Sequence, residues 1–328
     1  MDSISQFVLG AAIGQACFGK KNNGKGALLG GVGATLPDLD FLAVMNSSII
    51  DQLIFHRGFS HSLLFCIFIP FLFAWLSKRL LSFKATYKHW YFFWFLIFST
   101  HVIFDLMTSW GTQIFWPAPN RISLNSWFIV DPLVSLPLII GIIIYKLKRS
   151  SKTLYFVFAF CSAYIAFSLS MQFWMTNQFK SALAQQNISY EKLLVRPTPF
   201  NTLYWTTTIK TYDDSLIMAY SRIWDSANNI TFKEPIKQNS HYLRDYLGLK
   251  AIQQLFDITH GYYVIEASES NLIVHDARYG VVAGWINTAQ EFLFSFSLDL
   301  ETGVWKQERE EVADMGVVMR ALFKQIIE

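Results

Sequence analysis

The first half of the chain is built from long apolar runs, whereas the second half alternates between apolar and polar positions. Runs of helical length cover residues 4–18, 28–45, 63–76, 89–107, 129–145 and 154–171. Each run approaches the roughly 20 residues that a helix needs to cross a bilayer. The pattern therefore predicts a polytopic α-helical membrane domain of five or six helices over residues 1–174.

The second half, residues 175–328, predicts a small α+β domain. Short segments rich in β-branched and aromatic residues, separated by turn residues, predict strands at 203–210, 215–223, 262–266, 271–275, 281–286 and 291–300. Amphipathic patterns predict helices at 176–186, 241–256 and 310–327. The change in pattern after residue 174 indicates a domain boundary there.

Glycines recur at a spacing of four in the first two apolar runs. Gly10 and Gly14 lie in the first run, and Gly26 and Gly30 lie at the start of the second. Small residues at this spacing allow two helix backbones to approach closely in lipid. We therefore expect the first two helices to pack together through these positions.

Basic residues gather in every second connection between the apolar runs. They are Lys20, Lys21, Lys25, Lys78, Arg79, Lys84, Lys88, Lys146, Lys148, Arg149 and Lys152. The other connections hold only Arg57 and Arg121. By the positive-inside rule, the basic connections are expected to be cytoplasmic. The α+β domain is then expected to be extracytoplasmic, on the same side as the N-terminus and Asp38, Asp40, His56, His61, Asp105 and Asp131.

Composition supports a membrane protein and excludes one class of partner. Of the 328 residues, 52% are hydrophobic and 17% aromatic, which is too apolar for an ordinary soluble protein. A net charge of +3 is too small to indicate nucleic-acid binding. Cys17, Cys66 and Cys161 lie inside apolar runs without ligand spacing, and are expected to be small buried hydrophobic groups.

Six residues that commonly bind metals surround the apolar runs. His56 and His61 precede the third run, Asp38 and Asp40 follow Pro37, and His101 and Asp105 share one helix face. Together they predict a site for a divalent metal ion rather than a purely structural polar cluster. A mixed histidine and aspartate set suits Zn²⁺, with Mn²⁺, Mg²⁺ or a two-metal centre as alternatives.

Other polar residues have both a functional and a structural interpretation. Arg57 is either a clamp for an oxyanion or an ordinary cation at the membrane interface. The segment 108–113 could line a polar pocket, and Asp131 either joins the site or ends a loop before a helix, the latter being favoured. His241, His260 and His275 have no ligand spacing, and residues 276–280 are expected to form a turn.

Several motifs together resemble a known family. They are residues 1–10, the Gly-Ala-Thr-Leu-Pro-Asp-Leu-Asp run ending at Asp40, residues 56–62, residues 101–105 with 108–113, and residues 128–132. The combination resembles the YdjM-like family of LexA-regulated, inner-membrane, metal-dependent hydrolases of bacteria. The resemblance covers roughly residues 1–145, with a weaker match at 276–280.

The resemblance implies a multi-pass protein of the bacterial inner membrane with metal ligands among the six residues above. One position departs from the family, which usually has a histidine where this chain has Gln6. A glutamine carbonyl ligates metals more weakly than an imidazole. The substitution is therefore expected to lower metal affinity or to change the preferred metal.

Two functions are expected from these residues. The first is a membrane-bound, metal-dependent hydrolase that acts on an ester or phosphoester of a small molecule or lipid at the outer membrane face. A carboxylate of Asp38, Asp40 or Asp105 would be the general base, and Arg57 would stabilise negative charge. The alternative is a non-enzymatic membrane scaffold or metal-binding sensor. A coordination position left open for substrate would favour the enzyme.

Overall fold

The computed structural model describes residues 2–19, 24–148, 150–268, 271–282, 284–285, 292–308 and 315–327. The chain divides into two units, described separately below. Unit 1 comprises Met1–Ala43, Phe55–Gln172 and Pro199–Thr202. Unit 2 comprises Val44–Ile54, Phe173–Thr198 and Leu203–Glu328. The main division falls inside one long helix, close to the predicted domain boundary.

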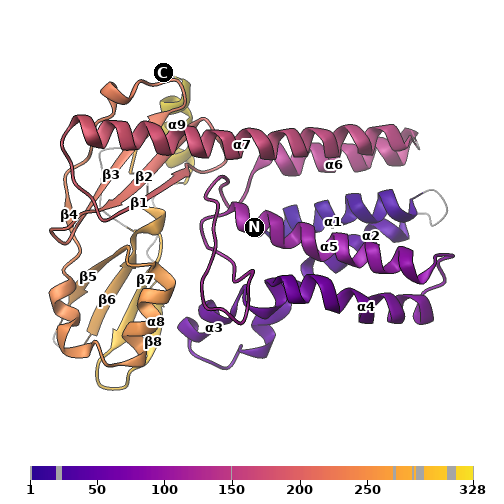
Figure 1. Cartoon of the computed structure of the whole chain (residues 1–328), viewed down its shortest axis with the longest axis horizontal. Coiled ribbons are helices and arrows are strands. Elements are labelled where there is room, and N and C mark those ends of the chain that lie inside the picture. The colour runs from indigo at the N-terminus through magenta and orange to yellow at the C-terminus, as the bar shows by residue number, and fades with distance from the viewer. Residues whose placement is uncertain are drawn as a thin grey trace. The chain divides into compact units, whose positions relative to one another are not determined.

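Unit 1 is helical. Its elements are α1 (Ser3–Phe18), α2 (Lys25–Thr35), η1 (Pro37–Ala43), η2 (Phe59–His61), α4 (Leu63–Leu80), α5 (Tyr87–Met107), α6 (Pro132–Lys148) and the first part of α7 (Ser151–Gln185) (Figure 1). Among the described residues, α4, α5 and α7 are long and apolar enough to cross a membrane, and α1 is a shorter apolar helix. The apolar helices of the predicted membrane domain are present, and the total of five or six spans stays a prediction.

The predicted second apolar run does not form one helix. The α-helix α2 ends at Thr35, and a 3₁₀ helix follows from Pro37. Proline has no backbone N–H and its ring disfavours continuation of an α-helix, which explains the change at this point. The tighter 3₁₀ turn contains both Asp38 and Asp40 and places them directly after α2.

The glycines of α1 and α2 make the predicted close contact. A Cβ atom added at Gly10 would lie 2.2 Å from the carbonyl oxygen of Gly30, and one added at Gly14 would lie 2.0 Å from that of Gly26. Both distances are shorter than any tolerated contact. The two backbones therefore touch, as the spacing of small residues predicts.

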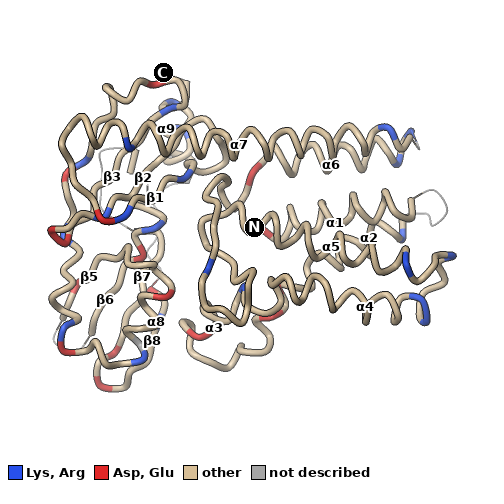
Figure 2. The backbone as a smooth tube through the Cα atoms, in the orientation of Figure 1, with Lys and Arg blue, Asp and Glu red and all other residues tan. Residues whose placement is uncertain are grey.

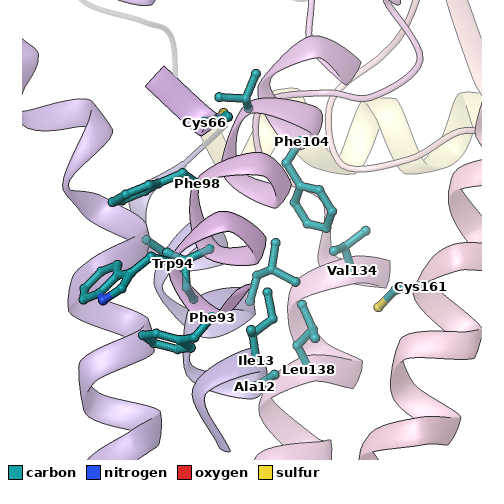
Figure 3. Close-up of a cluster of buried hydrophobic side chains, with 14 of the residues drawn as sticks. Ala12, Ile13, Cys66, Phe93, Trp94, Phe98, Phe104, Val134, Leu138 and Cys161 are labelled. Atoms are coloured by element: carbon teal, nitrogen blue, oxygen red, sulfur yellow. The ribbon is translucent and has the colours of Figure 1, made fainter. Parts of the chain in front are cut away.

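An aromatic core packs around α5 in unit 1. Phe93, Trp94 and Phe98 of this helix are buried, and they lie close to Ile13 of α1 and Leu138 of α6 (Figure 3). Cys66 and Cys161 are also buried in this core, where they act as small hydrophobic groups. Packing of this density holds the ends of α2, α4 and α5 in fixed positions.

Charge is segregated along the helices of unit 1. Figure 2 shows the lysines and arginines of the α4–α5 and α6–α7 connections at one end of the helices, away from the N-terminus. Asp2, Asp38, Asp105 and Asp131 lie at the other end, where α1 and α6 begin and where α2 and α5 end. Lys20, Lys21 and Arg149 lie outside the described residues. This segregation is the one on which the orientation prediction rests.

Unit 2 contains two antiparallel four-stranded sheets. One has the order β1 (Lys192–Pro197), β2 (Tyr204–Lys210), β3 (Ser215–Arg222) and β4 (Ile236–Lys237). The other has the order β5 (Tyr263–Ala267), β6 (Asn271–Asp276), β7 (Ser295–Asp299) and β8 (Trp305–Glu308). Helical elements are α3 (Ile49–Phe55), η3 (Ala227–Asn229), η4 (Ser240–Tyr246), α8 (Lys250–Thr259), η5 (Ala277–Tyr279) and α9 (Met315–Ile327). The predicted sheet-containing domain is therefore present.

The helix α3 belongs mainly to unit 2, although it lies in sequence between η1 and η2. Its residue Ile50 is fully buried with Leu243, Ile252 and Leu298. Asp51 accepts a hydrogen bond of 2.6 Å from Gln254 of α8. No pattern in the sequence indicates this arrangement.

Several predicted boundaries in unit 2 are wrong. Residues 176–185 continue α7 instead of forming a separate helix, and 241–256 divides into η4 and α8. Within the predicted strand 281–286, the described residues form a turn with one bridge between Val281 and Phe292, while residues 283 and 286 lie outside the described part. The predicted strand 291–300 shortens to β7, and residues 310–314 of the predicted last helix are also undescribed.

Candidate metal centre

Four side chains converge at the aspartate-rich end of unit 1. They are Asp38 of η1, His61 of η2, and His101 and Asp105 of α5, and one ligand atom from each lies within 4.8 Å of the others. The two Nε2 atoms of His61 and His101 are 3.0 Å apart. Asp38 Oδ1 lies 3.3 Å from His61 Nε2 and 3.4 Å from His101 Nε2. Both histidines are fully buried.

Hydrogen bonds at the other ring nitrogens determine which way these histidines present their lone pairs. His101 Nδ1 lies 2.6 Å from the carbonyl oxygen of Ala34, which can only accept, so Nδ1 carries the proton. Ser60 Oγ donates to Asp40 Oδ2 at 2.7 Å and therefore accepts from His61 Nδ1 at 2.8 Å. A neutral imidazole protonated at Nδ1 has its lone pair on Nε2. Both lone pairs thus face the same point.

This donor set fits a divalent metal ion. Two nitrogen lone pairs and two carboxylates that converge in a buried place repel one another unless a cation lies among them. A proton can join the two nitrogens, whereas a metal ion satisfies all four groups at once. The contacts of both Nδ1 atoms are also the outer hydrogen bonds that fix metal-ligating histidines in other proteins.

The two oxygens of Asp105 have separate roles. Oδ2 faces the histidines, at 3.1 Å from His61 Nε2 and 3.5 Å from His101 Nε2. Oδ1 is held from the opposite side, by Arg57 Nη2 at 3.2 Å and by the amide nitrogen of Gln6 at 3.3 Å. These two donors orient the carboxylate so that Oδ2 points to the proposed ion.

Asp40 and His56 form a pair beside the four residues. His56 Nδ1 lies 2.8 Å from Asp40 Oδ1, and the structure does not bring either side chain into the four-residue group. Burial alone raises the pKa of Asp40, but hydrogen bonds from His56 and Ser60 lower it below its usual value. Asp40 is therefore ionised at neutral pH. Of the six predicted ligands, four converge and these two support them.

Arg57 is buried in the site with an unusual backbone conformation. Its φ of +62° is rare for a residue with a side chain, and its backbone N–H donates to Asp40 Oδ2 at 3.2 Å. The guanidinium donates to Thr108 Oγ1 at 2.9 Å as well as to Asp105. Its Nε has no hydrogen-bond partner among the described residues. A buried donor of this kind is suited to binding an oxyanion.

The remaining candidates lie outside the four-residue group. Asp131 Oδ2 accepts a hydrogen bond of 2.7 Å from Tyr164, and its Oδ1 caps the first turn of α6 at Leu133, in agreement with the favoured structural interpretation. In the segment 108–113, Thr108 reaches Arg57, whereas Thr112 pairs with Ile122 through its backbone. His241, His260 and His275 belong to unit 2.

Two contributors could not be found from the sequence. The Ala34 carbonyl that orients His101 is a backbone group at the end of α2, so no residue type identifies it. Ser60 connects Asp40 to His61 through its hydroxyl. The only signal for Ser60 is its position next to His61 in the histidine-flanked motif.

Gln6 is expected to act on the metal through Asp105. Its amide nitrogen, rather than its carbonyl, faces the carboxylate, and it also donates to the carbonyl of His101 at 3.2 Å. Gln6→Ala should therefore weaken Zn²⁺ binding about tenfold, the smaller end of the effect of losing an outer hydrogen bond to a ligand. Competition against a chelator measures this change. Gln15→Ala, a buried glutamine on the same helix, is the matched control, and equal affinity in both variants would show that Gln6 does not hold Asp105.

Comparison with known proteins agrees with the motifs that form the site. The sequence profile of the YdjM inner membrane protein family matches residues 1–175, which include all four converging side chains. No curated protein and no solved structure matches the chain. Because the match covers more than half of the 328 residues, the chain belongs to the YdjM inner membrane protein family.

Proposed function

We propose that this protein is a membrane-bound, metal-dependent hydrolase of an ester or phosphoester. The observation that carries the proposal is the convergence of His61 Nε2, His101 Nε2 and two carboxylates beside the buried guanidinium of Arg57. Asp38, His61, His101 and Asp105 would hold the ion. When bound, a divalent cation supplies Lewis acidity toward an ester or phosphoryl oxygen. Zn²⁺ suits this mixed set best, and Mn²⁺ or Mg²⁺ are alternatives.

The chain supplies a proton acceptor next to the four residues. Asp40 accepts from His56 Nδ1, which leaves His56 Nε2 as the basic nitrogen. The His56 ring lies 5.5 Å from the His61 ring, and its side chain is partly exposed. In this proposal the Asp40–His56 pair takes the proton of the attacking water, which replaces the direct carboxylate base expected from the sequence.

Arg57 would stabilise the negative charge that develops on the substrate. Two of its nitrogens already bind Asp105 and Thr108, which fixes the guanidinium plane. The remaining Nε–H is a buried donor with no described partner. A donor already fixed in place costs little reorganisation when an oxyanion forms next to it.

A metal-binding sensor or scaffold is the alternative function, and it rests on the same four residues. In that case the four side chains would close the coordination shell, and no position would be left for a substrate. The partly exposed His56 favours the enzyme, because a structural site needs no basic group beside it.

The proposed substrate is a small molecule or a lipid at the outer face of the bacterial inner membrane. This location follows from the segregation of lysine and arginine at the opposite end of unit 1 (Figure 2). The same rule makes unit 2 extracytoplasmic. His61 precedes α4, and His101 and Asp105 lie near the end of α5, so the site would lie at the level of the lipid headgroups if these two helices cross the membrane.

Reporter fusions test this orientation. Fusions at Lys84 and Lys148 should report the cytoplasm, because these residues lie in the basic connections. Fusions at Arg121 and at the C-terminus should report the extracytoplasmic side. A cytoplasmic C-terminus together with an external Arg121 would show that the number of spans after α5 differs from the predicted one.

The hydrolase proposal is tested with purified protein in detergent. Metal content is measured by elemental analysis, and the protein loaded with Zn²⁺, Mn²⁺ or Mg²⁺ is screened against phosphoesters, carboxylic esters and lipids. Hydrolysis that is lost in His56→Ala, while metal content is retained, would support the proposed proton acceptor. Full metal loading with no hydrolysis of any substrate would favour the sensor or scaffold. Absence of metal binding would contradict both the hydrolase and the metal-binding sensor.

A further inference from the structure

A second group of buried donors lies in unit 2 and is independent of the metal centre. Arg196 of β1 is only 5% exposed, and it lies opposite Thr206 of β2 in the antiparallel sheet. Among the described residues, its Nε has no hydrogen-bond partner, and no carboxylate forms an ion pair with its guanidinium. A buried charge without a partner is costly, so native proteins rarely keep one without a use for it.

The buried carboxylate of Asp276 is already paired with another arginine. Asp276 binds Arg278 through both oxygens, with Arg278 Nη2 at 2.7 Å from Oδ2 and Nε at 3.0 Å from Oδ1. Both side chains are at most 3% exposed. Among the described residues, the Asp276 carboxylate is thus bound by Arg278, and no carboxylate forms an ion pair with Arg196.

Aromatic donors surround the unpaired guanidinium. Arg196 Cζ lies 5.6 Å from the centre of the Tyr279 ring. Thr206 of β2 lies opposite both Arg196 of β1 and Tyr220 of β3 in the sheet, so Arg196 and Tyr220 flank the same position. The ring of Tyr220 in turn contacts Trp285 at 6.4 Å between centres. The indole Nε1 of Trp285 is a second buried donor without a partner among the described residues.

Two glycines bring backbone close to these donors. A Cβ atom at Gly280, whose φ is +70°, would lie 3.2 Å from Arg196 Nη2. A Cβ atom at Gly284 would lie 2.1 Å from the hydroxyl oxygen of Tyr220. Side chains at these positions would press on the Arg196 and Tyr220 donor atoms, so glycine allows the backbone at positions 280 and 284 to lie next to them.

We propose that Arg196, Tyr220 and Trp285 form a binding site in unit 2 for a small oxyanion, a phosphate or carboxylate group. The unpartnered atoms of Arg196 and Trp285 are donors only, so the missing partner is an acceptor. Arginine carries a full charge, so a water molecule would leave that charge uncompensated. A phosphate or carboxylate group supplies both the acceptor oxygens and the negative charge. The proposal does not depend on the proposed hydrolase activity.

Binding and thermal unfolding of the full chain in detergent test the site. The probes are inorganic phosphate, acetate and short-chain phosphatidic acid, each compared with sodium chloride at the same ionic strength. At least one probe should raise the midpoint of thermal unfolding of the wild type. Arg196→Met should weaken its binding about tenfold or more, the effect of losing a hydrogen bond to a charged group. Arg244→Met, which replaces an exposed arginine of η4, is the matched control and should behave as the wild type.

A second measurement on the same variant distinguishes loss of the binding site from misfolding of the protein. Because Arg196 is unpaired without ligand, Arg196→Met should unfold in the absence of anion at a midpoint no lower than that of the wild type. Binding of phosphatidic acid alone would support the site and assign the phosphate to a lipid headgroup. The proposal is overturned if no probe binds beyond the chloride control, if Arg196→Met binds as tightly as the wild type, or if its midpoint without anion falls.

Discussion

His101→Ala is expected to remove most of the bound metal ion, with a loss of affinity greater than about 100-fold. Loss of an outer hydrogen bond to a ligand already costs about 10–100-fold, and loss of the ligand itself costs more. The imidazole is fully buried, so its removal leaves a buried cavity. The substitution also leaves the Ala34 carbonyl without its hydrogen-bond donor. Neither Asp38 nor His61 can replace the missing nitrogen, because each is already directed at the same point.

The control for this variant lies on the same helix. His89→Ala removes an imidazole from the exposed first turn of α5, at the other end from His101. Elemental analysis and competition against a chelator should show full metal content in His89→Ala and almost none in His101→Ala. His61→Ala should behave as His101→Ala, whereas His275→Ala in unit 2 should retain the metal. Equal metal content in all of these variants would rule out the site.

The four converging residues could be predicted because their types and spacing carry the signal. His101 and Asp105 are one helical turn apart, and this spacing alone places them on one face. Asp38 and His61 lie in short 3₁₀ turns next to apolar helices, and polar groups there need partners. The helices of unit 1 follow from the length of the apolar runs for a similar reason.

The different roles of Asp38, which joins the four converging residues, and Asp40, which pairs with His56, could not be predicted. The two residues are separated by one position, and the direction of each side chain depends on the 3₁₀ geometry of η1, which the sequence pattern does not reveal. The same holds for His56 and His61, because the direction of each side chain depends on the backbone between them, which includes the positive φ of Arg57. Family motifs identify such residues as a group and leave the role of each open.

The strands β1 and β8 of unit 2 were not predicted, and the reason is different. β8 is an edge strand, and three of its four residues are exposed and polar or charged. β1 is also an edge strand, and it begins with Lys192 and ends with Arg196 and Pro197. Charged residues and proline are typical of sheet edges, where they prevent pairing with other chains, and they weaken the hydrophobic signal of a strand.

Gly10→Ala is expected to destabilise unit 1 and to weaken metal binding, although position 10 contributes no ligand. The added methyl group would lie 2.2 Å from the carbonyl oxygen of Gly30 and 2.4 Å from Cβ of Ala34. Backbone atoms cannot move aside as a flexible side chain can, so α1 and α2 must separate. Overpacking of this kind costs about 1–3 kcal/mol of folding free energy, and more when backbone must shift.

Separation of α1 and α2 should move Ala34 and thereby disturb the metal centre. The Ala34 carbonyl orients His101, and Gln6 on α1 holds Asp105, so separation of α1 and α2 disturbs both ligands of α5. Gly248→Ala is the matched control, because a Cβ atom there meets no neighbour within 4 Å and its backbone conformation is ordinary. Thermal unfolding and chelator competition should show losses in Gly10→Ala and none in Gly248→Ala. Weaker folding with unchanged metal affinity would mean that the α1–α2 contact supports the fold without positioning His101.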